Sequence, residues 1–179
     1  MKPESVLSFW FEEIKSEKWW VVDPAFDTLI RDRFGEVLEQ ASHGELYGWR
    51  AEPRGRLAEI IVLDQFSRNI HRGKASAFAA DGVALVLAQE AIAAGALENL
   101  SAIERNFVLM PFMHSESRTI HVRAEQLFRE YAPGNNLDFE LKHKAIIDRF
   151  GRYPHRNRNL GRESSNEELE FLKGPGSSF

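Results

Sequence analysis

Apolar side chains recur every three to four residues along most of this chain, which is the spacing of amphipathic α-helices. The first such group is Val6, Leu7, Trp10, Phe11 and Ile14. These positions share one face of a helix, so the chain is predicted to open with an amphipathic helix.

A second helix is predicted from Asp23-Pro24, where aspartate can cap the free amides and proline fits the first helical position. It ends at His43-Gly44. The apolar stripe between these points consists of Phe26, Ile30, Phe34, Val37, Leu38 and Ala41.

Residues 54–66 and 76–94 form the next two apolar segments. The first contains a branched run from Ile60 to Leu63, which predicts a helix but also fits a buried strand. The second is rich in alanine, leucine and valine and closes at Gly95, which is typical of a helix buried over much of its surface. Asp81 and Gly82 interrupt its apolar character near the start.

Capping and breaking residues predict the helices of the second half. Ser101 and Glu104 form a capping box, and Pro111 is expected to kink or end the helix that follows. Further helices are predicted at 115–131 and 137–150, the latter ending at Gly151. A last short helix begins at Ser164 or Ser165, with Glu167 or Glu168 completing a second capping box, and ends before residue 174.

The pattern therefore predicts an all-α protein of about eight helices in antiparallel pairs. We expect a single domain over residues 1–173 and a short tail over 174–179, loosely held unless Phe179 docks. There is no internal repeat of fixed period and no low-complexity segment.

The amino-acid composition and net charge exclude several classes of protein function. The 179 residues are 43% hydrophobic and 28% charged, as in a soluble globular protein. A net charge of −4 argues against a nucleic-acid-binding surface over the whole molecule, and the absence of cysteine excludes disulfides and thiolate metal sites. No uninterrupted apolar run approaches membrane-spanning length, and residues 1–5 lack a secretory layout, so a cytoplasmic location is expected.

Two distant segments combine hydrogen-bonding groups with large apolar side chains. One runs from Leu63 to Gly73, and the other runs from Arg149 to Asn157 and continues to Ser164. Solvated loops rarely have this mixture. We interpret the two segments as two walls of one polar site.

Three motifs resemble a mainly bacterial family, domain of unknown function 924. They are Leu63-Asp64-Gln65-Phe66-x-Arg68-Asn69-Ile70-x-Arg72-Gly73, Pro111-x-x-His114-Ser115-Glu116 and Arg149-Phe150-Gly151-Arg152-x-Pro154-His155-Arg156-Asn157. The resemblance covers nearly the whole chain and implies an all-helical, tetratricopeptide-like fold. Ser67 stands where the family commonly carries proline, which bears on a turn. The resemblance implies no activity and no catalytic residue.

The arginine-rich second segment has two interpretations. Its guanidinium groups can bind phosphate or carboxylate in a bidentate manner, which predicts an anion site. Alternatively, they pair with carboxylates of the chain itself, for which the candidates are Asp64, Glu116, Asp148 and Glu163. A mixed arrangement, with Arg152 and Arg156 structural and other arginines facing a ligand, also fits.

Other chemistries have weaker support. A metal site would draw on histidines and carboxylates, but Glu140-x-x-His143 has no second copy and no metal is predicted. An enzyme would use His114, Glu116 and His155 as acid–base groups, although a nucleophile elbow and a phosphate loop are both absent. Ser115 is a conceivable nucleophile.

Four tryptophans fall within the first 50 residues. Core packing explains them best, and the alternative is a groove that receives a peptide or partner helix, or a self-association surface. These residues are Trp10, Trp19, Trp20 and Trp49.

The favoured hypothesis is that the protein binds a small anionic ligand between the two segments. The alternatives are a scaffold that binds a peptide or partner helix and an enzyme that uses the same cleft. No cofactor is predicted. Arg68, Arg72, Arg152 and Arg156 would supply charge, and Asp64 and Glu116 would hold the arginines. The predicted ligand-binding residues are Asp64, Arg68, Asn69, Arg72, Arg152, His155, Arg156 and Asn157.

Overall fold

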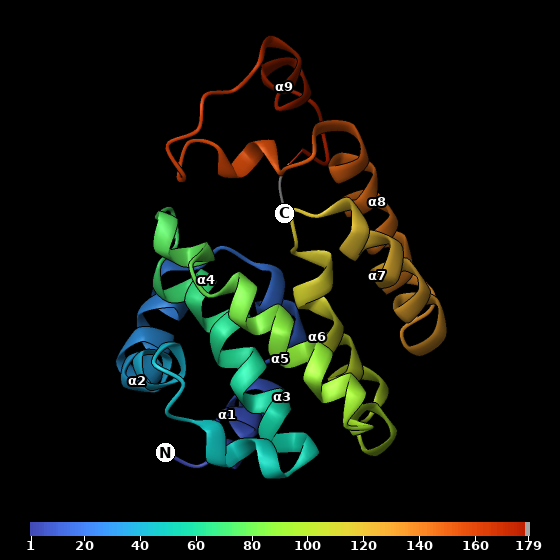
Figure 1. Cartoon of the computed structure of the whole chain (residues 1–179). Helices are drawn as coiled ribbons and strands as arrows, with labels where there is room; N and C mark the ends of the chain where they lie inside the picture. The colour runs from blue at the N-terminus through green and yellow to red at the C-terminus, as the bar shows by residue number, and fades with distance from the viewer. Residues whose placement is uncertain (178–179) are drawn as a thin grey trace.

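The computed structural model describes residues 1–177, and these form helices joined by short connections, with no β-strand among them (Figure 1). The all-α prediction is confirmed. The α-helices are α1 Pro3–Ser8, α2 Pro24–Ser42, α3 Pro53–Ile61, α4 Ser67–Ile70, α5 Asp81–Ala93, α6 Ala102–Met113, α7 Arg118–Tyr131, α8 Asn135–Phe150 and α9 Asn166–Phe171. Short 3₁₀ turns cover Ser16–Trp20, Tyr47–Ala51, Ala75–Phe78, Ala96–Asn99 and Pro154–Arg156.

Residues 53–70 form one helical rod, so the strand alternative for the branched run was wrong. The rod widens into a π-turn at Val62–Phe66 between α3 and α4. Ser67 therefore lies within the rod rather than in a turn, and its hydroxyl donates a 2.6 Å hydrogen bond to the carbonyl of Leu63. π-Turns of this kind are frequent at functional sites, and this one carries the buried Asp64 and Gln65.

Helix α5 begins later than its composition predicts. The expected helix from Ser76 is a 3₁₀ turn over Ala75–Phe78, and the α-helix starts at Asp81. The carboxylate of Asp81 pairs with arginines outside α5, which fixes this end of the helix.

Most cap predictions are confirmed. Asp23 caps α2 through the amides of Ala25 and Phe26, and Ser165 with Glu168 forms the capping box of α9. The Ser101–Glu104 capping box is likewise present at the start of α6. Helix α6 does not end at Pro111 but continues to Met113, because a proline there removes only one intrahelical hydrogen bond close to the natural end.

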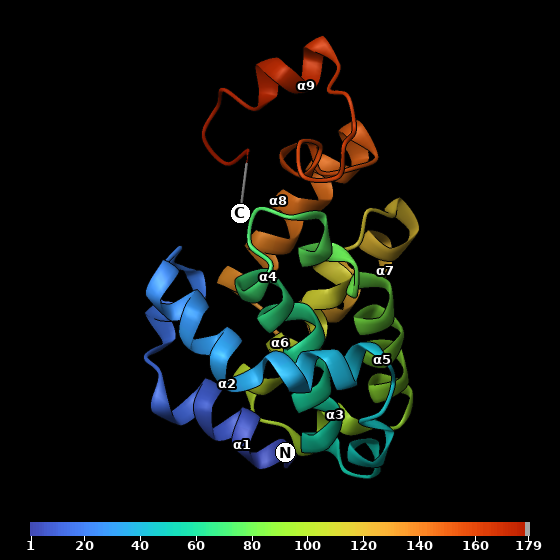
Figure 2. The same ribbon diagram turned by 90° about the vertical axis from the view of Figure 1, so that its left-hand side faces the viewer.

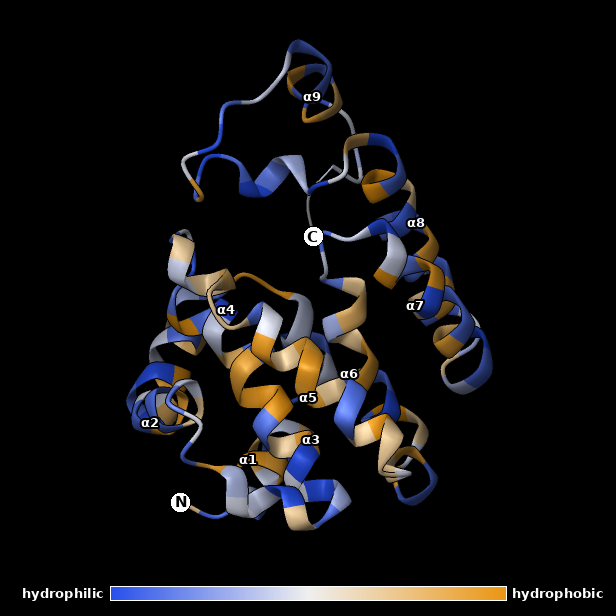
Figure 3. Cartoon of the chain, in the orientation of Figure 1, coloured by the Kyte–Doolittle hydropathy of each residue, from blue (hydrophilic) through white to orange (hydrophobic). Residues whose placement is uncertain are grey.

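Residues 75–93 are the one helical stretch in the described chain that is long and apolar enough to cross a membrane, judged by length and composition alone. Two charged residues, Asp81 and Glu90, interrupt this stretch. A core helix of a soluble protein has the same length and composition. The small buried residues of α5, Ala84, Ala88 and Ala91, lie in the interface with α3 and α6. Leu87 of α5 is buried as well, whereas Val83 and Val86 are exposed, and much of the α5 ribbon is coloured as hydrophobic in Figure 3.

Apolar side chains form two separate clusters. The large cluster joins α1 to α7, and its centre is a set of aromatic rings around Phe66, with Phe34 4.7 Å and Trp10 5.5 Å away between ring centroids. The small cluster contains Ile146 and Ile147 of α8 with Tyr153. Views from two sides show the chain beyond α8 lying at one end of the molecule, above α4 (Figures 1 and 2).

The predicted tail starts in the described part of the chain at residue 174, while Phe179 lies outside the described residues. The single-domain boundary at residue 173 stays a prediction.

Candidate functional site

The two segments meet at Asp81, the first residue of α5. Arg68 of α4 approaches the Asp81 carboxylate at 3.0 Å, and Arg156 of the Pro154–Arg156 turn approaches it at 3.1 Å. Nothing in the sequence indicated that Asp81 would join them. Residues separated by 88 positions thus share one carboxylate, which brings the predicted walls together.

Arg68 also bonds within its own rod. Its Nη1 atom donates a 2.6 Å hydrogen bond to the Asp64 carbonyl and lies 3.2 Å from the Asp64 carboxylate. The π-turn before α4 places Asp64 one helical turn before Arg68, and both side chains face the interior. Charges therefore alternate from Asp64 through Arg68 and Asp81 to Arg156.

Asp64 is fully buried and makes two further contacts. His114 Nδ1, at the end of α6, lies 2.7 Å from its Oδ1 atom, and the Gln65 amide donates to its Oδ2 atom. Burial opposes ionisation of Asp64, but Arg68 and His114 outweigh it and hold the pKa of this carboxyl below its usual range. Asp64 is therefore a carboxylate at neutral pH.

Arg156 is the least satisfied cation of the group. It is 6% exposed, its guanidinium stacks between the rings of Phe78 and Tyr153, and its Nε–H has no hydrogen-bond partner within residues 1–177. Burial and the neighbouring Arg68 lower the pKa of Arg156. Two guanidinium groups that repel each other are thus held close together in a poorly solvated place.

Tyr153 contacts Arg156 through its ring and a second polar group, His121 with Glu140, through its hydroxyl. Its hydroxyl donates to the Met113 carbonyl and lies 3.2 Å from His121 Nε2. His121 Nδ1 lies 2.7 Å from Glu140, and both of these side chains are completely buried. Burial raises the pKa of Glu140.

The other predicted ligand-binding arginines are matched to carboxylates. Arg72 and Asn69 both donate hydrogen bonds to Asp27 of α2. Arg152 bonds Glu168 of α9, which lowers the pKa of Glu168 to about 2. The interpretation in which arginines pair within the chain therefore describes Arg72 and Arg152.

The polar groups of the C-terminal segment mainly hold that segment together. Glu116 accepts hydrogen bonds from the Arg162 guanidinium and from the backbone amide of Tyr153. Asn157 donates to Ser164 and accepts from Arg162. Arg149 pairs with Glu167, so the partners of these arginines differ in part from those expected.

The catalytic candidates are not gathered on one reacting centre. Glu116 is occupied by Arg162, whereas His114 belongs to the Asp64 group. His155 lies against the Tyr153 ring, with 5.6 Å between centroids, and burial lowers its pKa to about 4. Among residues 1–177, no group of three or more histidine and acidic side chains is placed to hold a metal ion.

The tryptophans divide between core and surface. Trp10 is buried, Trp19 and Trp49 are partly buried against the large cluster, and Trp20 is 59% exposed. Core packing is therefore the role of three of them, while Trp20 faces solvent.

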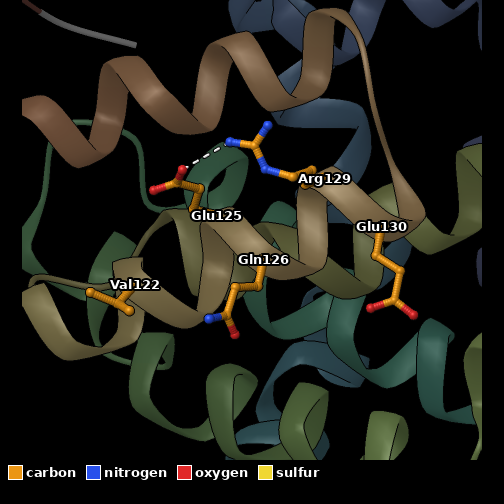
Figure 4. Close-up of a pocket in the computed structure, with 5 residues that line it drawn as sticks. All are labelled: Val122, Glu125, Gln126, Arg129 and Glu130. Carbon is orange, nitrogen blue, oxygen red and sulfur yellow. Dashed lines mark hydrogen bonds and ion pairs between the residues drawn. The ribbon is translucent and has the colours of Figure 1, made fainter.

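Two surface hollows lie away from the arginine cluster. One, of about 390 Å³, follows the outer face of α7 along Val122, Gln126 and Glu130, where Glu125 pairs with Arg129 (Figure 4). The other, of about 440 Å³, is lined by Met1 and residues of α2. Neither contains a residue of the predicted ligand-binding set.

The protein is therefore an all-helical protein with a buried cluster of charged side chains between its helices. A family model described as a bacterial protein of unknown function, DUF924, matches residues 6–176. The chain belongs to this family, which confirms the resemblance found in its motifs.

A solved structure of a protein of unknown function from Agrobacterium tumefaciens is similar to this chain throughout. The two are 37% identical, with a TM-score of 0.91, over 96% of this chain and 97% of the other. No curated protein matches the chain.

Proposed function

We propose that this protein binds a small oxyanion, carrying phosphate or carboxylate, at the guanidinium groups of Arg68 and Arg156. The observation that carries the proposal is the burial of Arg156, whose side chain is 7% exposed and whose Nε–H has no hydrogen-bond partner in the described chain. An unpaired buried donor is costly, and an anion oxygen would satisfy it.

The pairing of Arg68 with Arg156 supports the same ligand class. Both converge on one carboxylate, Asp81, whose side chain is 18% exposed at the start of α5. A bound oxyanion would either join Asp81 or replace it between the two guanidinium groups. The Asp81 carboxylate thus occupies the position between the two guanidinium groups in which the carboxylate or phosphate of a ligand would bind.

The proposal is narrower than the site expected from the sequence. Arg72, Asn69, Arg152 and Asn157 are engaged elsewhere, so they serve to position the walls rather than to contact the ligand. Asp64 orients Arg68 from within the same rod. Arg68 and Arg156 supply the charge.

Thermal unfolding in phosphate tests the proposal, with chloride at the same ionic strength as reference. A ligand that binds only the folded state raises the melting temperature with concentration. We expect phosphate to stabilise the wild-type protein and Arg156→Gln to abolish that gain. Arg129→Gln, the same change at a surface ion pair on α7, should keep it.

The variant Asp81→Asn provides a second test of phosphate binding. Removing the internal carboxylate leaves the arginine pair uncompensated, so this variant should be less stable in chloride and gain more from phosphate than the wild type. Equal responses to phosphate and chloride in both the wild type and Asp81→Asn would overturn the proposal.

The remaining expectations stay predictions: the tetratricopeptide-like layout, the cytoplasmic location, the peptide or protein partner, homo-oligomer formation and the enzyme alternative.

A further inference from the structure

His114 lies close to Arg68, one member of the arginine pair. Its Nδ1 atom lies 2.7 Å from Oδ1 of Asp64, and the Arg68 guanidinium lies 3.2 Å from the same oxygen. The imidazole and the guanidinium are therefore within two hydrogen-bond lengths of each other. A tetrahedral oxyanion presents several oxygens, so it can reach both groups at once.

Asp64 fixes which ring nitrogen carries the proton. The carboxylate is ionised and can only accept, so His114 donates through Nδ1–H and the lone pair of the neutral ring lies on Nε2. Within residues 1–177, no hydrogen bond to Nε2 is present, and the side chain is 12% exposed. Nε2 is the atom that can gain a proton.

Charged groups from three elements surround this ring, and a further histidine lies nearby. They are Asp64 of the π-turn, Arg68 of α4 and Asp81 of α5, with His143 of α8. Burial, followed by Arg68, lowers the pKa of His114, so the ring is neutral in the free protein at neutral pH. An incoming anion would offset the Arg68 charge and favour the imidazolium form.

We propose that His114 takes up a solvent proton at Nε2 when a tetrahedral dianion binds at Arg68 and Arg156, and becomes the third cationic contact of the ligand. The inference rests on the proposed function and adds the ligand class, a phosphate- or sulfate-like dianion. It changes the assignment of His114 from an acid–base candidate of an enzyme to a ligand-binding residue.

The sign of the pH dependence follows from linkage. The pKa of His114 is lowered in the free protein and raised by the bound anion, so binding takes up one proton between these two values. Within that window, affinity falls as pH rises, by up to about tenfold per pH unit. Below and above the window, affinity does not depend on this group.

Sulfate is the probe of choice, because it stays a dianion from pH 6 to 9 and phosphate does not. Titration calorimetry across this range, with ionic strength held by chloride, should show sulfate affinity falling with pH in the wild type. The heat should depend on the buffer's ionisation enthalpy as expected for proton uptake. His114→Gln, whose amide can still bond Asp64, should give pH-independent affinity.

His43→Gln is the matched control, because His43 is exposed at the end of α2 and should leave the wild-type slope intact. A measurement on the unmodified protein covers the case in which His114→Gln fails to fold. The ¹⁵N chemical shift of His114 Nε2 should move to the protonated value when sulfate is added near neutral pH.

Sulfate binding with the same affinity at every pH, or a slope that persists in His114→Gln, would overturn this inference and leave anion binding at Arg68 and Arg156 standing. An absence of sulfate binding at every pH, together with no phosphate-specific stabilisation, would overturn both. The two failures are therefore distinguishable.

Discussion

The large apolar cluster and the C-terminal segment are held in place by different forces. Around Phe66, aromatic rings from α2, α6 and the turn that follows α1 pack against one another, and one guanidinium, that of Arg33, lies over the rings of Phe9 and Phe34. Beyond α8, the chain is attached mainly by polar contacts, which are the ion pairs Arg162–Glu116 and Arg156–Asp81 and the Tyr153–Met113 hydrogen bond, together with a small apolar cluster. Figure 3 shows the contrast, with hydrophilic residues along the segment that leads to α9.

The difference between apolar packing in one region and ion pairing in the other indicates how the arginine cluster is held in place. Apolar burial is non-directional and gives most of the stability, whereas ion pairs contribute less and demand specific geometry. The arginine cluster lies where the two regions meet, at the Asp81 end of α5. A change in the C-terminal segment can therefore alter the site without unfolding the large cluster.

The largest effect is expected in the apolar region. Phe34→Ala removes a completely buried ring that lies 4.8 Å from Phe9 between centroids. The loss should be about 3–5 kcal/mol of unfolding free energy, measured by urea denaturation, because a cavity remains. Phe139→Ala, at a half-exposed phenylalanine of α8, is the control and should cost much less. Equal costs would remove the contrast between core and surface.

Glu116→Ala tests the ionic attachment. The substitution deprives Arg162 and the Tyr153 amide of their acceptor, at a cost of about 2 kcal/mol given partial exposure. Hydrogen exchange should accelerate in residues 153–177 while α3 keeps its protection. Glu116→Gln, which keeps one acceptor oxygen, should lie between. Uniform acceleration throughout the chain would show that the two regions unfold as one.

Acidification should weaken the C-terminal side through two buried histidines. Burial lowers the pKa of His143 to about 3 and that of His155 to about 4, whereas both titrate near 6.5 when unfolded. The unfolded state binds more protons, so stability is complete above about pH 6.5 and falls as pH decreases toward the folded-state values. Each group should cost about 2 kcal/mol at pH 5 relative to pH 7.

His143→Gln checks this pH dependence. The glutamine amide can still donate to the Phe139 carbonyl, as His143 does, but it cannot be protonated. Urea denaturation at pH 5 and pH 7 should show a smaller difference in this variant than in the wild type. An unchanged difference would mean that His143 does not contribute.

The smallest effect is expected at an exposed pair near the end of the chain. Lys173 and Glu170 have side chains 69% and 73% exposed. Solvent and salt screen such pairs, so Lys173→Ala should change stability by less than about 0.5 kcal/mol in thermal unfolding. Arg152→Ala, which leaves the buried Glu168 carboxylate unpaired, should be clearly destabilising. If both variants behaved alike, the attachment of α9 would not depend on its ion pair.

Local signals predicted the helices well. The caps at Asp23, Ser101 and Ser165 depend on residues a few positions apart, so the sequence shows both partners. Residues 54–66 were predicted to be helical with a strand alternative left open, because the branched run from Ile60 to Leu63 also fits a buried strand. Asp81 was recognised only as an interruption of α5, since its two arginine partners are remote along the chain.

The same limit applies to the candidate site. The motifs predicted that Asp64, Arg68 and Arg156 lie in one region, because polar groups among apolar residues must be satisfied nearby, and ion pairs through Asp81 connect these three residues. They did not separate Arg72 and Arg152 from that group, since an arginine beside a ligand and an arginine beside a carboxylate have the same local sequence. Nor did they indicate that His114 would share an oxygen with Arg68.

By itself, the sequence determined the helical class and the positions of most helix ends, and it predicted that the segments at 63–73 and 149–164 share one polar region. These properties depend on spacing and composition over a few residues. The tertiary structure alone decided which carboxylate each guanidinium meets, and that Arg156 keeps a donor unmatched in the described chain. Ion pairing depends on distances of a few ångströms between residues far apart in the chain, and only the packed helices fix those distances.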